Sequence, residues 1–406
     1  MADEPMQGPL EGIRVVELAT TFSGPYCGLQ LRQLGATVIK VEAPQGDITR
    51  HLGTSRNPGM ASVYLAVNGG KRSIALDLKQ ARGKDVLLHL LADADVLLHN
   101  MRSRATERLG IDYPSLAERL PRLIYCGIYG FGAGGPYAGK PAYDDIIQGM
   151  SGLAAVQGLA GSTVGTAPAY VASTVADKVA GYAATVGILG ALVGRVVTGR
   201  GQAVEVPMFE AMTEFSLLEH QGGHAFVPSE GPGLYPRLMS ANRRPYPTKD
   251  GHLSVVVYTG AHLVRFLQRV GLDAMLADPR YADDAGRSEN IDDLYQIVAD
   301  QLKTRTTQEW LEVLEELDIP AMQVNTPDEL LEDPHLAAVD FYRHLEHGSE
   351  GTLRQMRAPL SFSETTLPET GPPSRLGEDG PAILAEYGYS QQEVDQLLAQ
   401  GVLIVS

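Results

Sequence analysis

Five short β-rich runs alternate with helix-like stretches over the first 130 residues of this chain. Strands that alternate with helices in this way pair in parallel through right-handed crossovers, and the helices cover both faces of the sheet. The pattern therefore predicts an α/β fold whose large domain is Rossmann-like, with a mostly parallel sheet. The β-rich runs are residues 13–19, 37–44, 71–78, 94–100 and 122–130, and the helix-like stretches include 25–34, 81–92 and 114–120.

A change of pattern near residue 225 indicates a second domain. At 406 residues the chain is longer than one ordinary core requires. The segment that follows is rich in Pro, Gly and other turn-forming residues, and it interrupts the earlier alternation. We expect a large domain over 1–224, a linker over 225–250, a smaller α+β domain over 251–330, and a linker with a C-terminal return to the large domain over 331–406.

The charge of the chain argues against a nucleic-acid partner. The formal net charge is −16, and the sequence has no cluster of Lys and Arg of the kind that a phosphate backbone needs. A small anionic ligand needs only a local patch of Arg, Lys and backbone N–H groups, so such a ligand remains possible.

Cysteine usage and the N-terminal segment indicate a cytoplasmic protein. The two cysteines, Cys27 and Cys126, lie far apart and form no CxxC motif, which is typical of a reducing compartment. The acidic N-terminal residues contain no apolar signal segment. The most apolar run, residues 179–193, is shorter than the ~20 residues of a membrane helix, so we expect a buried helix and no membrane partner.

A glycine motif in the chain imitates a dinucleotide-binding fingerprint. Gly130, Gly132 and Gly135 satisfy G-x-G-x-x-G after a strand, but Pro136 follows and the next residues do not open a helix. The phosphate-binding mechanism of that fingerprint depends on a helix N-terminus. We expect a loop that moves over a ligand.

The ten His residues are dispersed, so we expect no metal site.

The carboxylate of Asp177 stands at the head of the long apolar run and admits two interpretations. Thr174 and Asp177 have the spacing of a capping box, in which a hydroxyl and an acid satisfy the first N–H groups of a helix. A carboxylate that the helix dipole keeps ionised is also a good nucleophile, and nearby N–H groups can hold an oxyanion. The residues alone leave both interpretations open.

An ordered series of sequence blocks resembles the family III CoA-transferases, the CaiB/BaiF family. The resemblance covers nearly the whole chain and rests on several blocks rather than on one motif. The blocks are PLEGIRVVEL, LGATVIKVEAPQGD, NGGKRSIALDL, ERLGIDY, YCGIYGFGAGGPYAGKPAYDD, ADKVAGYAATVGILGALVGRVVTGRGQAVEVPMFEA, TKDGHL, DIPAMQVNTPDELLEDPHL and RLGEDG.

This resemblance implies a fold, an assembly and a reaction. Its members join a Rossmann-like domain to a small domain by linkers, and two ring-shaped chains interlock as a homodimer. The nucleophilic Asp of the family stands where Asp177 stands here. The implied reaction moves CoA from an acyl-CoA to a carboxylic acid through mixed anhydrides and an aspartyl-CoA thioester, with CoA as a substrate and no tightly bound cofactor.

The resemblance also implies contacts with CoA. Lys71 and Arg72 are further candidates for phosphate binding on charge grounds, because they lie just before a strand. The positions that match CoA-contacting residues of the family are Thr20, Thr21, Asn100, Met101, Arg108, Lys140 and Tyr143.

Two departures from the family pattern bear on the type of reaction. Phe22 stands where formyl-CoA transferases have Gln, which argues against formyl/oxalate exchange. Tyr143 stands where α-methylacyl-CoA racemases have His, and a phenol with a pKa near 10 is a poor proton shuttle. Racemase activity and a non-catalytic CoA-binding protein remain the alternatives to a transferase.

Arginines near residue 240 bear on the acceptor acid. Arg237, Arg243 and Arg244 follow His220 and His224, and these side chains have the charge to bind the second carboxylate of a dicarboxylic acid such as succinate. Surface arginines with no ligand are the alternative interpretation. The sequence does not identify the donor or the acceptor.

Overall fold

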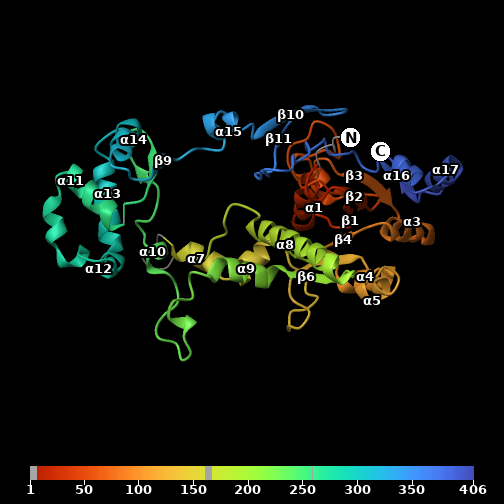
Figure 1. The fold of residues 1–406 in the computed structure, drawn as a ribbon, viewed down its shortest axis with the longest axis horizontal. Coiled ribbons are helices and arrows are strands. Elements are labelled where there is room, and N and C mark those ends of the chain that lie inside the picture. Colours follow the sequence, from red (N-terminus) through yellow and green to blue (C-terminus); the bar gives the residue numbers. More distant parts are fainter. Residues whose placement is uncertain (1–6, 161–166, 258) are drawn as a thin grey trace. The chain divides into compact units, whose positions relative to one another are not determined.

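The computed structural model of the protein describes residues 7–160, 167–257 and 259–406 (Figure 1). Contacts within the chain divide it into two compact units, each with its own hydrophobic core. Unit 1 comprises Met1–Ile147, Ser173–Met212 and Pro334–Ser406, and unit 2 comprises Gln148–Ala172 and Thr213–Asp333.

A seven-stranded sheet forms the centre of unit 1, in the order β12-β3-β2-β1-β4-β5-β6. All neighbouring pairs are parallel except β12 with β3. The predicted α/β class and mostly parallel sheet are therefore confirmed. The strands are β1 (Arg14–Glu17), β2 (Thr37–Glu42), β3 (Arg72–Leu76), β4 (Val96–His99), β5 (Ile124–Tyr129), β6 (Ala203–Pro207) and β12 (Leu403–Ile404).

The strand order locates the place where a ligand is expected. From β1 the chain builds outward through β2 and β3 on one side, and through β4, β5 and β6 on the other. The carboxyl ends of β1 and β4 therefore lie at a topological switch point, where open α/β sheets leave a crevice for ligands. The loops that follow these two strands carry Thr20, Thr21, Asn100 and Met101.

Helices surround the sheet of unit 1, together with an antiparallel hairpin of β10 (Tyr342–His347) and β11 (Gly351–Met356). Two more helices, α6 (Asp144–Met150) and α9 (Met208–Leu217), cross from one unit into the other. The helices of unit 1 are α1 (Ser23–Gln33), η1 (Ile48–His51), α2 (Ser62–Val67), α3 (Ala81–Ala92), α4 (Ser103–Leu109), α5 (Tyr113–Ala117), α8 (Val175–Thr198), α15 (Pro334–Ala338), α16 (Gly380–Glu386) and α17 (Gln391–Ala399).

The apolar run predicted as a buried helix is the central part of α8, but only one face of it is buried, because Tyr182, Val186 and Val193 are 50%, 68% and 69% exposed. This helix packs against α1, β5 and β6, and its small residues allow the close approach: a Cβ on Gly187 would lie 2.6 Å from Val204 Cγ1 (Figure 1). The helix continues past this run to Thr198, and the buried side chain of Arg195 donates to Asp95 at 2.8 Å. Among the described residues, α8 alone is long and apolar enough to cross a membrane by length and composition.

Unit 2 is a smaller α+β arrangement around a three-stranded antiparallel sheet in the order β7-β8-β9. Its core includes Trp310, whose ring stacks on Phe266. The strands are β7 (Tyr246–Pro247), β8 (His252–Val255) and β9 (Ala321–Gln323). The helices are α7 (Leu153–Leu159), η2 (Gly222–Ala225), α10 (Pro236–Met239), α11 (Gly260–Arg269), η3 (Asp273–Ala277), η4 (Pro279–Tyr281), α12 (Asp284–Glu289), α13 (Ile291–Leu302), α14 (Thr307–Glu316) and η5 (Glu329–Leu331).

The units differ in their bounds from the ranges that the sequence pattern suggested. Residues 148–160 and 167–172 fall within the predicted range 1–224, yet they belong to unit 2. Gly152 lies against Leu217, and the Ala169 N–H donates to the Ala154 oxygen at 3.0 Å. The first contact joins residues that are distant in sequence, so no local pattern predicts it, whereas the second holds the segment itself together.

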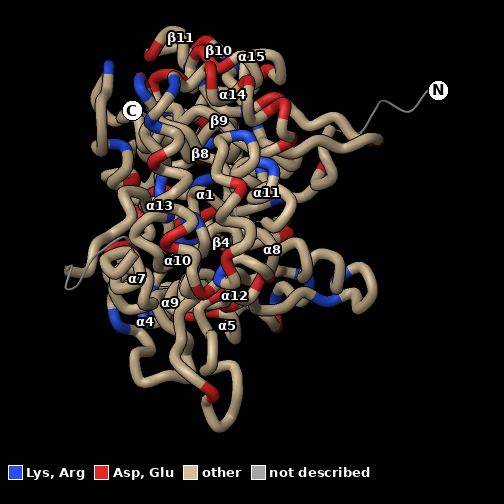
Figure 2. Tube along the Cα trace, turned by 90° about the vertical axis from the view of Figure 1, so that its left-hand side faces the viewer, with Lys and Arg blue, Asp and Glu red and all other residues tan. Residues whose placement is uncertain are grey.

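Charged residues of both signs are interspersed along the chain, as Figure 2 shows. Blue Lys and Arg segments alternate with red Asp and Glu segments. An anionic ligand must therefore be bound by a small number of local groups rather than by a broad basic face.

Candidate active site

A cavity of about 310 Å³ opens at the carboxyl ends of β1, β4 and β5, at the switch point of the sheet. Its walls come from the loops after these strands, from the glycine loop after β5, and from the first turn of α8. Seven of the residues predicted for the site line this one cavity: Thr20, Thr21, Asn100, Met101, Lys140, Tyr143 and Asp177.

A pair of hydrogen bonds joins the loops that follow β1 and β4. The Thr20 N–H donates to Asn100 Oδ1 at 3.0 Å, and Asn100 Nδ2 donates to the Thr20 oxygen at 2.7 Å. The Met101 N–H donates to His99 Nδ1 at 3.1 Å. Burial lowers the pKa of His99 to about 4, so its ring is neutral at physiological pH and can accept this bond. Both loops are thereby held in place at the cavity.

Thr21 occupies a strained backbone conformation. Its φ is +72°, in the left-handed region that a β-branched residue rarely adopts. The Thr21 N–H donates to both oxygens of Asp47, at 3.1 and 3.2 Å. Asp47 in turn pairs with Lys40 at 2.9 Å, and both side chains are buried. The strain is therefore sustained by buried charges beneath the loop.

Lys71 belongs to the same buried network and not to the cavity. Its Nζ lies 2.9 Å from Glu17 Oε2 and donates to the Pro25 oxygen at 2.7 Å and to Asn68 Oδ1 at 3.0 Å. The residue is 2% exposed, and burial lowers its pKa to about 8. With its donors occupied inside the protein, Lys71 is unavailable to a phosphate, so the structure corrects this prediction.

Arg72 and Arg108 also lie outside the lining of the cavity. Arg72 makes two bonds to Glu386, at 2.6 and 2.8 Å, which link β3 to α16 of the C-terminal segment. Its charge is therefore used within the fold, contrary to the predicted phosphate contact. Arg108 is exposed on α4 and keeps a free face toward solvent.

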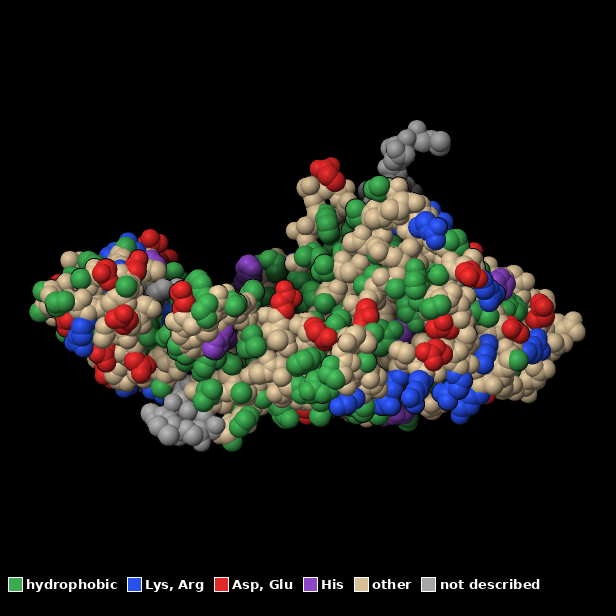
Figure 3. Space-filling view, turned by 90° about the horizontal axis from the view of Figure 1, so that it is seen from below, with side chains coloured by type: hydrophobic (Ala, Val, Ile, Leu, Met, Phe, Trp, Pro, Cys, Tyr) green, Lys and Arg blue, Asp and Glu red, His purple; other side chains and the backbone are tan. Residues whose placement is uncertain are grey.

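Two basic residues at the cavity have the charge that an anionic ligand needs. Lys140 was predicted from the sequence, whereas Arg102 was missed because it stands before α4 in a run of ordinary-looking arginines. Arg104 and Arg108 continue this run and are exposed. Figure 3 shows Lys and Arg side chains gathered in one patch on the face that it presents. Local positive charge thus exists on a chain with a net charge of −16.

Asp177 lies in the first turn of α8, and it is not the cap of this helix. Thr174 precedes the helix but makes no side-chain cap bond. Instead, Oδ1 of Asp144, from α6, accepts the N–H groups of Ala176 at 2.8 Å and of Asp177 at 3.1 Å. The capping-box interpretation is therefore wrong. Because Asp144 satisfies these N–H groups, the Asp177 carboxylate is left to face the cavity.

The environment of Asp177 disfavours its ionised form. Burial is the largest cause, the charge of Asp144 adds to it, and a hydrogen bond from the Ser23 hydroxyl opposes both; together they raise the pKa of Asp177 to about 7. A strongly perturbed carboxyl group in a cleft is a typical mark of a functional site. A poorly solvated carboxylate is also a stronger nucleophile than one in bulk water.

The glycine loop after β5 is tethered by two carboxylates. The Gly132 N–H donates to Glu210 Oε1 at 3.0 Å, and the Ala133 N–H donates to Glu205 Oε1 at 2.7 Å. No helix follows until α6 at Asp144, so the loop lacks the helix N-terminus of a dinucleotide site. Glu205 itself lines the cavity and was not predicted from the sequence.

Comparison with known proteins identifies the family. The profile described as CoA-transferase family III matches residues 10–380. The chain belongs to this family. A succinate–glutarate CoA-transferase from Agrobacterium fabrum is 33% identical over 95% of this chain and 98% of its own length. A cinnamoyl-CoA:phenyllactate CoA-transferase from Clostridium sporogenes is 30% identical over 95% of both chains.

Solved structures of the family agree with this assignment. A CAIB/BAIF family protein from Brucella suis matches with a TM-score of 0.78 and 30% identity, over 94% of this chain and 100% of that one. The protein is thus a family III CoA-transferase, an enzyme whose substrates are CoA thioesters. Its predicted family and enzyme class are confirmed.

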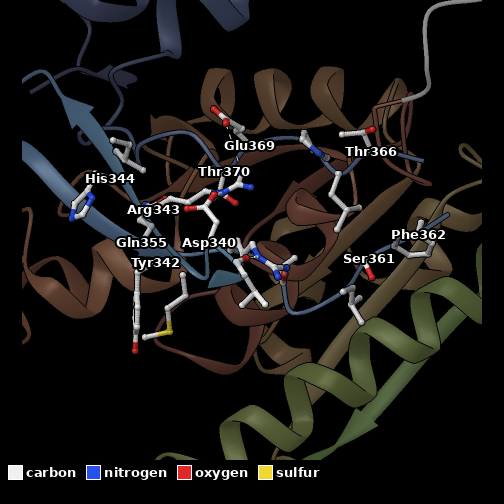
Figure 4. A pocket seen from close by; sticks show the side chains of 18 of the residues that line it. Asp340, Tyr342, Arg343, His344, Gln355, Ser361, Phe362, Thr366, Glu369 and Thr370 are labelled. Carbon is white, nitrogen blue, oxygen red and sulfur yellow. Dashed lines mark hydrogen bonds and ion pairs between the residues drawn. The ribbon is translucent and has the colours of Figure 1, made fainter. Parts of the chain in front are cut away.

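A second, larger cavity of this CoA-transferase lies elsewhere in unit 1. It measures about 650 Å³ and is lined by residues of the β10–β11 hairpin and of the segment that follows. Figure 4 shows Arg343 between two acids, and its guanidinium lies 3.0 Å from Asp340 and 3.7 Å from Glu369. The Arg343 guanidinium is already paired, and no nucleophile with a shifted pKa lines the larger cavity. This cavity is therefore a weaker candidate for the active site than the one at Asp177.

The described part of the chain contains no group of three or more His, Cys, Asp or Glu arranged to hold a metal ion.

Proposed function

We propose that the enzyme transfers CoA from an acyl-CoA to a carboxylic acid through a covalent aspartyl-CoA thioester on Asp177. One observation carries the proposal: the Asp177 carboxylate lines the switch-point cavity, while Asp144 performs the capping role that would otherwise occupy it. A carboxylate that is positioned, desolvated and free of a cation is suited to attack a thioester.

Four acyl transfers complete the reaction. Asp177 attacks the thioester carbonyl, the C–S bond breaks, and CoA leaves as thiolate from a mixed anhydride. The thiolate attacks Cγ of Asp177, the C–O bond breaks, and the donor acid leaves as carboxylate. The acceptor carboxylate attacks Cγ and expels the thiolate again. The thiolate then attacks the new acyl carbonyl, which yields the product acyl-CoA and restores the Asp177 carboxylate.

The remaining wall of the cavity supports the recognition of CoA. Arg102 and Lys140 bring positive charge toward the CoA phosphates, and Arg108 extends that charge along α4. The bonded loops of Thr20 and Asn100 offer a fixed edge for the rest of the ligand. Tyr143 stands at the mouth with 68% of its surface exposed, where a bound ligand would cover it.

We propose a dicarboxylate as the acceptor acid. The Agrobacterium relative is named for succinate and glutarate, and it supports this class. In unit 2, the Arg237 Nε donates to the Tyr295 hydroxyl at 2.8 Å, whereas Arg243 and Arg244 are exposed and have the charge that a second carboxylate needs. The Clostridium relative is named for phenyllactate, a monocarboxylate. A monocarboxylate is therefore the alternative acceptor against which a dicarboxylate should be compared in a transfer assay.

The interlocked homodimer stays a proposal that rests on the resemblance, and the cytoplasmic location stays one that rests on cysteine usage and the N-terminal residues. Native mass spectrometry of the purified chain tests the first: a species of twice the chain mass at low micromolar concentration is expected. A monomer at that concentration would contradict it.

The central experiment detects the aspartyl adduct. Wild-type protein incubated with succinyl-CoA and no acceptor should gain the mass of CoA less one water, and hydroxylamine should convert Asp177 to a hydroxamate that peptide mass spectrometry locates. Asp177→Ala should form no adduct. Asp145→Asn, an exposed acid next to Asp144, is the matched control and should form it normally. Racemisation of a 2-methylacyl-CoA without any adduct would favour the racemase alternative and overturn the proposal.

A further inference from the structure

The loop that connects β1 to α1 is held by side chains from other elements. It forms one edge of the switch-point cavity through Thr20 and Thr21. The Thr20 N–H and C=O groups both bond to the side chain of Asn100. Two further peptide groups of the loop, the Ala19 C=O and the Thr21 N–H, bond to charged side chains that are buried beneath it.

A single buried ion pair supplies these last two contacts. Lys40 Nζ lies 2.9 Å from Asp47 Oδ2, and the two residues are 0% and 1% exposed. The Lys40 ammonium donates to the Ala19 oxygen at 2.9 Å. The two Asp47 oxygens accept the Thr21 N–H at 3.1 and 3.2 Å. The cation therefore holds a carbonyl group before Thr20, and the anion holds an N–H group after it.

The conformation that the ion pair holds is one that Thr21 does not favour. Its φ of +72° lies in the left-handed region, where a β-branched residue is strained. Such a residue persists only where its surroundings over-determine its conformation. Here the surroundings are Lys40, Asp47 and Asn100, and each of them lies outside the loop. The ion pair thus offsets the strain and fixes the course of the chain from β1 into α1.

The two charges act on the cavity only through this loop. Neither Lys40 nor Asp47 lines the cavity, so neither contacts a ligand there directly. Other bonds keep both charges in place: Lys40 Nζ lies 3.1 Å from Glu17 Oε1, and Asp47 Oδ1 accepts the Thr49 N–H at 3.0 Å. The hold on the loop is therefore complete before any ligand arrives.

We propose that Lys40 and Asp47 are positioning residues, whose ion pair holds the Thr20–Thr21 edge in the conformation that binds acyl-CoA. This inference rests on the proposed role of the switch-point cavity as the CoA site. A ligand that binds one loop conformation loses affinity in proportion to the fraction of protein that adopts it. A preformed edge therefore strengthens binding of acyl-CoA, and it leaves the covalent steps at Asp177 unchanged once the substrate is bound.

A double-mutant cycle of Asp47→Asn and Thr21→Gly tests the proposal. An amide makes no ionic bond to Lys40, and its NH2 group accepts no N–H, so Asp47→Asn weakens the hold on the loop. Steady-state CoA transfer from succinyl-CoA to glutarate gives KM and kcat for succinyl-CoA. For Asp47→Asn we expect KM to rise roughly tenfold, as the strain at Thr21 implies, while kcat stays within about threefold of the wild type.

Thr21→Gly removes the strain, because glycine adopts a positive φ freely. In that background the loop needs less support, so Asp47→Asn should raise KM by only about twofold. A rise in KM by the same factor in both backgrounds would show that Asp47 does not act through Thr21, and it would overturn the proposal. A fall in kcat at an unchanged KM would indicate loss of folded enzyme and would also contradict it.

Asp112→Asn is the matched control. Asp112 caps α5 as Asp47 caps η1, but its bonds go to the N–H of Ser115 at 3.3 Å and to the Ser115 hydroxyl at 2.8 Å. This variant should leave KM for succinyl-CoA unchanged. A rise in KM as large as that of Asp47→Asn would show that the loss of any helix cap has this effect, and the proposal would then fail.

Hydrogen exchange of the unsubstituted enzyme gives a measurement that does not depend on the folding of a variant. Without ligand, the Thr20 and Thr21 amides should exchange slowly, because both N–H groups are bonded to side chains. Rapid exchange that CoA then suppresses would show that the ligand orders the loop, contrary to the proposal. A wild-type enzyme that binds CoA yet forms no aspartyl adduct would overturn the aspartyl route alone, because KM and amide exchange do not depend on that intermediate.

Discussion

Two groups of charged residues lie close together in unit 1 and behave in opposite ways. Beneath the loop of Thr21, Glu17, Lys40, Asp47 and Lys71 form a buried network in which every charge faces an opposite one. On the wall of the cavity, Asp177 faces another acid, Asp144, and the neutral side chain of Ser23 lines the same cavity. Paired buried charges hold a structure in place, whereas an unpaired carboxyl group with a raised pKa is available for chemistry.

The largest expected effect removes the unpaired carboxylate. Asp177→Asn keeps the size of the side chain but cannot form an anhydride, so CoA exchange should fall by more than about 10³-fold. The steady-state rate of CoA exchange between succinyl-CoA and glutarate measures this fall, with Asp145→Asn as the matched control. Retention of a tenth of the wild-type rate would mean that Asp177 is not the nucleophile.

Breaking the paired network should harm stability. Lys40→Met leaves Glu17 and Asp47 without their shared cation, and removal of one partner from a buried pair costs about 3–5 kcal/mol. The free energy of unfolding in urea should fall by that amount, whereas Lys79→Met, at an exposed lysine, should change it little. A loss below 1 kcal/mol would show that the network is not needed for the fold.

Asp177→Asn should also stabilise the enzyme at neutral and alkaline pH. The pKa of Asp177 rises from 3.8 to about 7 on folding, so between these values the native state binds more protons than the unfolded state. The contribution of Asp177 to the unfolding free energy therefore falls as pH rises across this window. At pH 8 the variant should exceed the wild type by roughly 1–3 kcal/mol.

Thermal unfolding at pH 4.5 and at pH 8 measures this difference. The gain in midpoint temperature should be large at pH 8 and small at pH 4.5, where Asp177 is protonated in the wild type. A gain of equal size at both pH values would point to packing rather than to charge.

A smaller effect concerns Asp144, the acid that lies beside Asp177. Aspartyl-CoA formation needs ionised Asp177, so its rate should rise as pH increases through about 7. Asp144→Asn retains an oxygen that can accept the Ala176 and Asp177 N–H groups but removes the repelling charge. The rise should then move to lower pH by up to about one unit. A shift toward higher pH would contradict the assigned role of Asp144.

The smallest expected effect lies in the larger cavity. Arg343→Gln breaks the ion pairs with Asp340 and Glu369, which are partly exposed and worth little. CoA exchange should stay within about twofold of the wild type. A loss of tenfold or more would show that this cavity takes part in the reaction.

Much of the framework follows from local patterns. The strand runs, the parallel sheet, Asp177 at a helix start, and Thr20 and Asn100 after two strands were all visible in the sequence, because each depends on neighbours along the chain. Lys71 and Arg72 were misjudged for a physical reason. A positive charge before a strand has the same appearance whether it meets a phosphate or an internal carboxylate, and here the partners are Glu17 and Glu386.

The sequence by itself determined the mostly parallel sheet and the carboxylate at a helix start, since alternation of strands and helices and the chain order of motifs are one-dimensional properties. Only the tertiary structure decided what that carboxylate is free to do. Asp144 and Ser23 reach Asp177 from α6 and α1, and neither lies in its own helix. Capping, desolvation and hydrogen bonding across elements depend on distance in space, and distance in space is set by packing.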